Sequence, residues 1–294
     1  MRFAVLGTGP WAGQVHAPAL AAHPDAELVA VWGRNAARAA ALGAEHGVPG
    51  SDDLDAVLDA VDAVAIALPP AVQAPLAERA ARAGKHLLLE KPVALDLAAA
   101  DRVAAAVRET GVASVVFFTY RFQQGTATWL TQAARTRQAG GSGSWLSALA
   151  GTPFADSAWR HEHGALWDLG PHALALLVPA LGPVVDVQAA AGQRDTVHLL
   201  LHHPEDVVST VTLSLTVAEL ATGVEFSLHG DAGRVVLIPE LADPLPAFAT
   251  AVDELRAAAL TGGAHPLDVH FGRDVVAVLA AAQRALATGC RETI

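Results

Sequence analysis

Short apolar runs alternate with alanine-rich stretches over the first 118 residues of the chain. This rhythm is typical of a parallel sheet whose strands are joined by helices that cover its faces. The apolar runs predict strands at 3–6, 28–32, 63–68, 86–89 and 112–118. The alanine-rich stretches predict helices near 11–22, 35–46, 71–83 and 96–109. We therefore expect a doubly wound α/β domain of the Rossmann type.

The rhythm changes after residue 120, where strand-like runs follow one another without helices between them. Helices are predicted near 126–138 and 165–181, and strands at 184–190, 196–202, 207–217, 224–228 and 234–238. Such a run of strands favours an open, largely antiparallel sheet. Helices near 245–260 and 269–287 follow, and the glycine- and serine-rich tract 139–144 is interpreted as a loop. We expect domains at 1–119 and 120–294, with the last helix free to pack back on the first domain.

Composition narrows the classes of function. The formal net charge of −11 opposes non-specific binding to nucleic acid, and no basic patch appears. No apolar stretch is long enough to cross a bilayer, and we expect neither a membrane span nor an export signal. The single cysteine, Cys290, excludes an intramolecular disulfide framework and fits a reducing compartment, so we expect a cytoplasmic protein.

A glycine fingerprint lies between the first predicted strand and the first predicted helix. It has the form G-x-G-x-x-A and consists of Gly7, Thr8, Gly9, Pro10, Trp11 and Ala12. The first glycine permits a tight turn, the second lets backbone approach a pyrophosphate, and the small third residue lets helix pack against strand. Because it lies in the required strand–turn–helix context, the fingerprint predicts dinucleotide binding more strongly than an ordinary glycine turn.

The end of the second predicted strand bears on the choice of dinucleotide. A carboxylate there would bind the ribose 2′-hydroxyl of NAD, but the chain has Gly33, Arg34 and Asn35. Asp25 and Glu27 precede the strand, at the opposite edge of the sheet. Since Arg34 can pair with a 2′-phosphate, we favour NADP(H) over NAD(H). If Arg34 is merely a solvated residue at a helix start, the choice stays open.

Lysine is rare in this chain, which has 19 basic residues besides histidine, of which only Lys85 and Lys91 are lysines. Lys91 follows a predicted buried strand and Glu90, and it precedes Pro92. Lysine is a compact charge whose pKa moves readily on burial, whereas arginine stays protonated. Lys91 is therefore a candidate functional residue, and Lys85, beside Gly84, is interpreted as a surface lysine in a turn.

Taken together, several motifs make the chain resemble the Gfo/Idh/MocA family of oxidoreductases over nearly its whole length. The resemblance rests on the fingerprint, Leu68-Pro69-Pro70, Glu90-Lys91-Pro92, Tyr120-Arg121-Phe122, Trp159-Arg160, Gly164, Asp168, Gly170 and His172. It implies reversible hydride transfer between NAD(P)(H) and a secondary alcohol or ketone, often of a sugar, cyclitol or related polyol. It also implies a homodimer or homotetramer formed through the open sheet.

The resemblance assigns roles to particular residues. The catalytic residues would be Lys91, Asp168 and His172. Cofactor contacts beyond the fingerprint and the 33–35 turn would come from Leu68, Pro69, Pro70, Gln73, Glu90, Lys91, Tyr120 and Arg121. Substrate contacts would come from Lys91, Tyr120, Trp159, Arg160, Asp168 and His172. Gln73 stands where many relatives carry histidine, and His163-Gly164-Ala165 replaces a frequent glycine run, so substrate identity stays open.

The chemistry of these side chains agrees with the implied reaction. Alcohol oxidation requires removal of a hydroxyl proton, and His172 is the best candidate for that step. An ammonium at Lys91 can stabilise charge on the reacting oxygen, and Asp168 can orient the histidine or bind a substrate hydroxyl. Residues 168 and 172 share a face of a continuous helix, although Pro171 predicts a kink or a helix start nearby. Taken singly, His172 could be a helix-start histidine and Asp168 an N-cap.

The sequence leaves two alternative functions open, and it also contains one group of residues that resembles a metal site. His161, Glu162 and His163 are adjacent residues that rarely converge on one ion, so no metal site is expected. One alternative is an NAD-dependent glycosidase of the same fold, which oxidises a sugar transiently to loosen a glycosidic bond. Another is a non-catalytic dinucleotide sensor that regulates a protein partner, although such a protein need not keep Lys91, Asp168 and His172 together.

Overall fold

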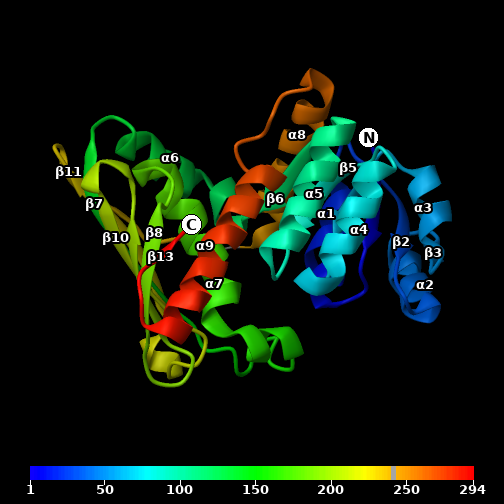
Figure 1. Cartoon of the computed structure of the whole chain (residues 1–294). Helices are drawn as coiled ribbons and strands as arrows, with labels where there is room; N and C mark the ends of the chain where they lie inside the picture. Colours follow the sequence, from blue (N-terminus) through cyan, green and yellow to red (C-terminus); the bar gives the residue numbers. More distant parts are fainter. Residues whose placement is uncertain (240–242) are drawn as a thin grey trace. The chain divides into compact units, whose positions relative to one another are not determined.

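The computed structural model describes residues 1–239 and 243–294, which group into two compact units. The first unit contains residues 1–119 and 243–273, and the second contains residues 120–239 and 274–294. Each unit is built around one β-sheet (Figure 1).

The first unit is a six-stranded parallel sheet in the order β3-β2-β1-β4-β5-β6. Its strands are β1 (Arg2–Leu6), β2 (Glu27–Trp32), β3 (Gly50–Ser51), β4 (Ala63–Ile66), β5 (His86–Glu90) and β6 (Ser114–Phe117). Side chains on both faces of the central strands are buried: residues 3–6 of β1 and 63–66 of β4 all have 0% exposure. The continuous apolar runs of the sequence therefore correspond to strands covered on both sides.

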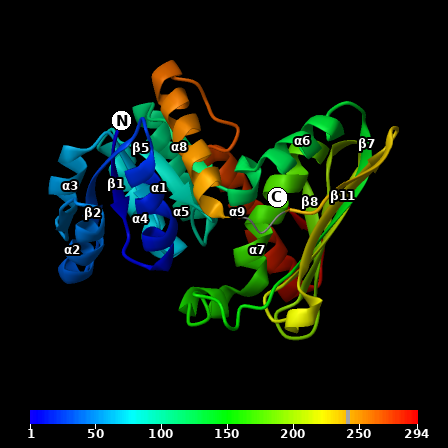
Figure 2. The same ribbon diagram turned by 180° about the vertical axis from the view of Figure 1, so that it is seen from behind.

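Helices cover both faces of this sheet. They are η1 (Ala12–His16), α1 (Ala17–Ala22), α2 (Ala36–Glu45), α3 (Leu54–Ala60), α4 (Pro70–Arg82), α5 (Leu97–Thr110) and α8 (Pro244–Thr261). The helix α1 packs against α8, and α4 packs against α5. Figure 1 shows α4 and α5 in front of the sheet, and Figure 2, from behind, shows α1 and α8 on the other face. This is the arrangement that right-handed crossovers produce in a sheet wound in two directions.

Two features of the first unit differ from the sequence-based expectation. The two-residue strand β3 and the helix α3 were not predicted, because so short a strand leaves no periodic pattern. Residues 243–273 group with the first unit, whereas a division at residue 119 would assign them to the second. Phe248 of α8 explains this grouping, because its fully buried ring packs edge-on against Phe117 of β6 with ring centroids 5.1 Å apart.

The second unit contains a seven-stranded sheet in the order β12-β11-β7-β10-β9-β8-β13. Its strands are β7 (Gln138–Leu146), β8 (Asp186–Ala191), β9 (Val197–His202), β10 (Val208–Ser214), β11 (Gly223–Gly230), β12 (Gly233–Leu237) and β13 (Glu292–Thr293). All neighbouring pairs are antiparallel except β7 with β10. Its helical elements are η2 (Thr119–Phe122), α6 (Gln124–Ala133), α7 (Ala158–Leu181), η3 (Pro204–Asp206) and η4 (Glu219–Ala221), while α9 (Val269–Thr288) is divided between the units. The prediction of a parallel sheet followed by a largely antiparallel one is confirmed.

The prediction of a loop at 139–144 was wrong, because this tract lies in the strand β7 near the middle of the second sheet. Glycine is tolerated here for a steric reason. A Cβ atom added to Gly143 would lie 2.3 Å from the ring of Phe226 on β11, so the phenyl group occupies the space that a side chain would need. Glycine and serine have low strand propensity, so the sequence showed no sign of a strand whose glycine makes room for an aromatic ring of the neighbouring strand.

The helix α7 carries two of the residues that the sequence singled out. Its only non-helical residue is Gly164 (φ 62°, ψ −163°), so the helix continues through Pro171 without a break. Asp168 and His172 are both buried on this continuous segment, one turn apart. Among the described residues, α7 is also the one helix long and apolar enough to cross a bilayer, but 78% of its most apolar window is buried inside the protein, as in a core helix.

Candidate functional site: a glycine cradle and a buried histidine

The turn after β1 has the geometry of a phosphate cradle. Gly7 has φ +141°, and a Cβ atom there would lie 2.4 Å from the carbonyl oxygen of Ala67, so only glycine fits this turn. A Cβ atom on Gly9, in contrast, would meet no atom within 4 Å. The exposed backbone of Gly9 thus borders open space just before the first helix, which suits a pyrophosphate group. The residues present fit a dinucleotide.

The predicted dinucleotide contacts of the first unit follow the carboxyl ends of four strands. Thr8 follows β1, Gly33 follows β2, Leu68 to Pro70 follow β4, and Lys91 follows β5. Because all these strands are parallel, their carboxyl ends meet at one edge of the sheet. The strand order reverses between β1 and β4, which is where open α/β sheets bind ligands.

A hydrogen-bonded group joins the fingerprint helix to the turn that carries Lys91. The indole Nε1–H of Trp11 donates to Oε1 of Glu90 at 2.7 Å, and Nε2 of His16 lies 2.9 Å from the same oxygen. Trp11 directly precedes η1 and His16 is its last residue; this π-helical turn is closed by a hydrogen bond from Ala17 N–H to Ala12 C=O. The wider turn helps bring two residues five positions apart to one acceptor.

His16 was missed by the sequence analysis, although a histidine within an alanine-rich helix was a visible signal. Its side chain is fully buried, and its ring lies against Phe248 with centroids 4.3 Å apart. Its Nδ1 atom has no hydrogen-bond partner among the described residues. A buried N–H without an acceptor is costly, so the tautomer protonated at Nε2, with the proton directed at Glu90, is favoured.

Gln73 holds the backbone on both sides of Lys91. Its side-chain Nε2–H donates to the carbonyl of Glu90 at 2.6 Å and to that of Pro92 at 3.2 Å, and its Oε1 accepts from Glu90 N–H at 2.9 Å. The side chain is fully buried. Gln73 was predicted as a cofactor contact, but these bonds commit its amide to the turn that presents the half-buried Lys91.

The end of β2 has the features that were used to favour NADP(H), together with one that was missed. Arg34 is exposed, and the side chain of Asn35 caps α2 by accepting from Arg38 N–H at 3.0 Å. The unpredicted strand β3 pairs with β2 and places Ser51 beside Trp32. The exposed Asp52 therefore follows the carboxyl end of the neighbouring strand, close in the sheet to the 33–35 turn.

In the second unit, Arg160 is committed to Asp168. Its Nε–H donates to Oδ2 of Asp168 at 3.0 Å, and both side chains are largely buried. The guanidinium carbon lies 4.3 Å from the ring centroid of Phe154 and 4.7 Å from that of Trp159. Two aromatic rings and the ion pair with Asp168 thus hold the guanidinium of Arg160, which was predicted to contact substrate.

The side chain of His172 lies among aromatic rings. It stacks on Trp145 of β7 with centroids 5.2 Å apart and planes inclined by 23°, and it meets Tyr120 at 5.4 Å and 88°. Burial, together with the charge of Asp168, raises the pKa of Tyr120 to about 12. Its phenol therefore stays protonated at neutral pH and can donate a hydrogen bond. Trp145 was missed because the strand that contains it was not predicted, and most of that strand was interpreted as a loop.

Two further side chains of the second unit have internal partners. Arg121, predicted to contact cofactor, donates from Nη1 to the carbonyl of Ala175 on α7 at 2.7 Å. Trp167 is 2% exposed, and its indole N–H donates to Oε1 of Gln283 at 3.0 Å. Trp167 is thus a core residue of the second unit.

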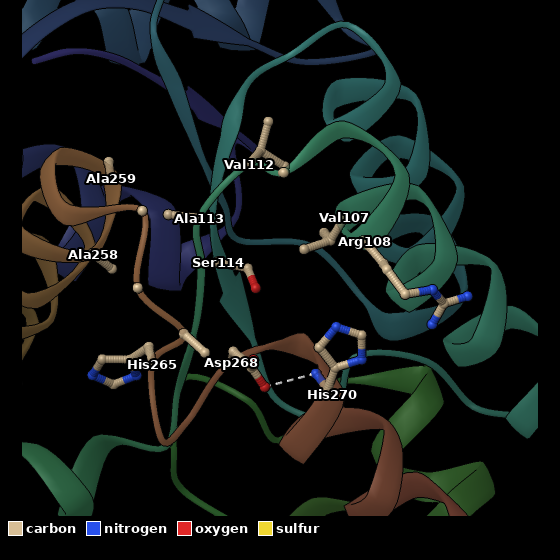
Figure 3. A pocket seen from close by; sticks show the side chains of 14 residues that line it. Val107, Arg108, Val112, Ala113, Ser114, Ala258, Ala259, His265, Asp268 and His270 are labelled. Atoms are coloured by element: carbon tan, nitrogen blue, oxygen red, sulfur yellow. Dashed lines mark hydrogen bonds between the residues drawn. The ribbon is translucent and has the colours of Figure 1, made fainter.

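A pocket of about 200 Å³ in the first unit lies away from these residues (Figure 3). Its wall includes Ser114 at the amino end of β6, and Arg108 and His270, whereas the fingerprint follows the carboxyl end of β1. The pocket is therefore at the opposite edge of the sheet. Within the part of the chain that the structure describes, no three His, Cys, Asp or Glu side chains are grouped so as to hold a metal ion.

Both units match domains of one known protein family. Residues 1–118 match the Gfo/Idh/MocA oxidoreductase family with its NAD-binding Rossmann fold, and residues 102–236 match the C-terminal domain of that family. The chain is 33% identical over 252 residues to a dTDP-3,4-didehydro-2,6-dideoxy-alpha-D-glucose 3-reductase of Streptomyces antibioticus, covering 81% of this chain and 75% of the relative. It is 41% identical over 127 residues to an inositol 2-dehydrogenase of Rhizobium meliloti, covering 42% of this chain and 37% of the relative.

Solved structures with the same fold cover the whole chain. A putative myo-inositol dehydrogenase from Sinorhizobium meliloti superposes with a TM-score of 0.87 at 24% identity, over 100% of this chain and 99% of that chain. GenD2 from gentamicin A biosynthesis, in complex with NAD, superposes with a TM-score of 0.88 at 24% identity, over 100% and 96%. The chain therefore belongs to the Gfo/Idh/MocA family of oxidoreductases and contains an NAD-binding Rossmann fold.

Proposed function

We propose that this oxidoreductase transfers hydride between a nicotinamide dinucleotide and a secondary alcohol or ketone of a sugar, cyclitol or related polyol. The proposal rests mainly on the hydrogen bonds of Trp11 and His16 with Glu90, which join the fingerprint helix to the turn that contains Lys91. They connect the phosphate cradle to the one candidate cation at the end of β5. The names of the reductase and the inositol dehydrogenase above support a sugar-like substrate.

Each catalytic side chain has a distinct proposed role. The dinucleotide supplies the group that accepts or donates hydride. His172 takes the hydroxyl proton during oxidation and returns it to the oxygen during reduction. Lys91 stabilises the negative charge that develops on that oxygen. Asp168, held by Arg160 at 3.0 Å, orients the imidazole one turn along α7 or binds a neighbouring substrate hydroxyl.

A substrate panel tests the proposed class. Aldoses, ketoses, cyclitols and small diols are each mixed with enzyme and with either nicotinamide cofactor, and the absorbance of reduced nicotinamide is followed. Turnover of at least one sugar or cyclitol is the expected outcome. Tight cofactor binding with no absorbance change across the panel would argue against the proposal.

The cofactor preference is a further part of the proposal. We expect the wild-type enzyme to bind NADPH more tightly than NADH, because Arg34 is exposed and can pair with the 2′-phosphate. Replacing Arg34 with alanine should weaken NADPH binding about tenfold, the scale of one charge-assisted hydrogen bond, and change NADH binding little.

Dissociation constants from titration calorimetry on the wild type and the Arg34→Ala variant measure both effects. Asp52→Asn is the matched control, because it removes the neighbouring carboxylate and should tighten NADPH binding if a 2′-phosphate lies nearby. Tighter binding of NADH than of NADPH by the wild type would overturn the preference and would favour a role for Asp52 at the ribose.

We also propose a homodimer or homotetramer formed through the open face of the second sheet. Leu200 is half-buried and lies directly opposite the exposed Thr210, while residues 199, 201 and 211 beside them point into the core. Small and partly apolar side chains on an uncovered face suit contact with a second copy of the chain. Sedimentation equilibrium measures the assembly, and a monomer at micromolar concentration would contradict this part.

A further inference from the structure

One of the aromatic side chains that contact His172 has no role in the proposed hydride transfer. This residue is Trp145, whose indole is stacked on the imidazole with centroids 5.2 Å apart and an interplanar angle of 23°. His172 is 7% exposed and Trp145 is 4% exposed, so the contact is shielded from water. All the residues of this contact belong to the second unit.

The indole is itself fixed in place. Tyr120 meets it edge-on, with centroids 4.7 Å apart and planes at 80°, and Phe226 of β11 approaches it at 6.2 Å and 73°. These are the separations and angles at which aromatic pairs attract each other. A ring held by two others in the strand β7 gives the imidazole a surface of fixed orientation.

We propose that Trp145 is a positioning residue for His172, whose indole face sets the plane of the imidazole and stabilises the imidazolium that forms when His172 accepts a proton. This inference rests on the proposed acid/base role of His172. A cation within about 6 Å of an aromatic centroid is attracted to the ring face, and tryptophan provides the strongest such face. Stacking on a neutral imidazole gains less, so the contact favours the protonated form.

Other groups around His172 act on its charge as well. Asp168, one turn earlier on α7, is a carboxylate, and its hydrogen-bonded partner Arg160 carries the opposite charge. Arg121 is positively charged and donates to the carbonyl of Ala175, three residues beyond His172 on α7. Tyr120 stays neutral at physiological pH, because its pKa is raised to about 12. Since these charges have both signs, the indole contribution must be isolated by substitutions at Trp145 alone.

The contribution of the Trp145 indole is measured by an NMR titration of the histidine side chains. The wild type and the Trp145→Phe and Trp145→Leu variants are labelled with ¹³C at histidine Cε1, and the His172 resonance is identified by its loss in His172→Gln. Leucine keeps the site apolar but has no π face, whereas phenylalanine keeps a weaker one. We expect the titration midpoint to fall in the order wild type, Phe, Leu, by roughly half a pH unit in total.

The control is Trp167→Phe, a buried tryptophan of α7 that donates to Gln283 and should leave the His172 midpoint unchanged. A Leu variant that titrates at or above the wild-type midpoint would overturn the proposal. If that variant does not fold, a Phe variant with an unchanged midpoint would overturn it equally.

An activity measurement separates this inference from the proposed function. Turnover by the His172→Gln variant close to wild type would remove the acid/base role, whatever the titration shows. Loss of turnover in that variant, combined with an unchanged midpoint in Trp145→Leu, would remove only the role of Trp145. If both proposals hold, oxidation requires a neutral His172, so the rise of kcat/KM with pH in Trp145→Leu should move to lower pH by the same amount as the titration.

Discussion

The Lys91→Ala variant should turn over at least about a hundredfold more slowly than the wild type, with its affinity for the dinucleotide changed much less. A loss of this size in turnover is expected when a group that stabilises the charge on the reacting oxygen is removed. Lys91 follows β5 directly, and Gln73 holds the backbone on both of its sides, so truncation removes an ammonium from a fixed position. Steady-state kinetics and cofactor titration on the same preparation separate the two effects.

Lys85 provides the matched control, as the only other lysine of the chain. Its Nζ donates to the carbonyl of Val61 at 3.1 Å, and Lys85→Ala should keep turnover within about twofold of wild type, as is usual for substitutions outside a site. Lys91→Arg should recover little activity, because a guanidinium is larger, planar and spreads its charge. Wild-type turnover by Lys91→Ala would mean that the charge at the reacting oxygen comes from another group.

The His172→Ala variant should also lose at least about a hundredfold in kcat, the usual scale for a missing general acid or base. The expected signature is a change of pH profile: the limb of kcat that reflects the imidazole should disappear, and residual turnover should rise towards high pH as hydroxide replaces the base. Kinetics across pH 5 to 10, a range that brackets the ordinary histidine pKa, measure both the magnitude and the profile.

Structural damage is the competing explanation for that loss, because His172 is buried against Trp145 and Tyr120. The His172→Gln variant retains a polar side chain of similar size and should fold, yet it cannot take up the proton. His270→Ala removes a half-buried histidine at the start of α9 and should leave kcat unchanged. A His172→Gln variant with wild-type kcat and an unaltered pH profile would rule out the assigned role.

The first unit could be predicted closely because its signals are local. Each long strand of its sheet contains a buried apolar run, and the glycine fingerprint lies between the first strand and the first helix in sequence order. The strand β3 escaped prediction because two residues, Gly50 and Ser51, cannot show a period. The inclusion of α8 depends on the contact of Phe248 with Phe117, whose positions are 131 residues apart, and no local pattern reports such packing.

The second sheet shows where propensity fails. The tract 139–144 has the composition of a loop, yet it lies in β7 because Phe226 from β11 fills the space above Gly143. Only the partner strand explains the glycine. The same error concealed Trp145, which follows the tract and stacks on His172.

For the candidate site, the types of residue could be predicted but their partners could not. Motifs singled out Glu90, Gln73 and Arg160 as contacts for a cofactor or substrate. The structure shows bonds from these side chains to Trp11 and His16, to the Lys91 turn, and to Asp168. Several residues named for ligand contact thus hold other functional groups in place. Whether a residue contacts ligand or holds another functional residue depends on the three-dimensional structure, because hydrogen bonds between side chains far apart in the chain do not affect the spacing of motifs.

Hydride transfer itself is the central claim, and isotope transfer tests it most directly. The best substrate of the panel is prepared with deuterium on its carbinol carbons and incubated with enzyme and oxidised cofactor, and the reduced cofactor is analysed by mass spectrometry. Direct transfer predicts one deuterium in the nicotinamide ring of each reduced cofactor molecule. Reduced cofactor that carries no deuterium, or substrate conversion without any reduced cofactor, would contradict the account.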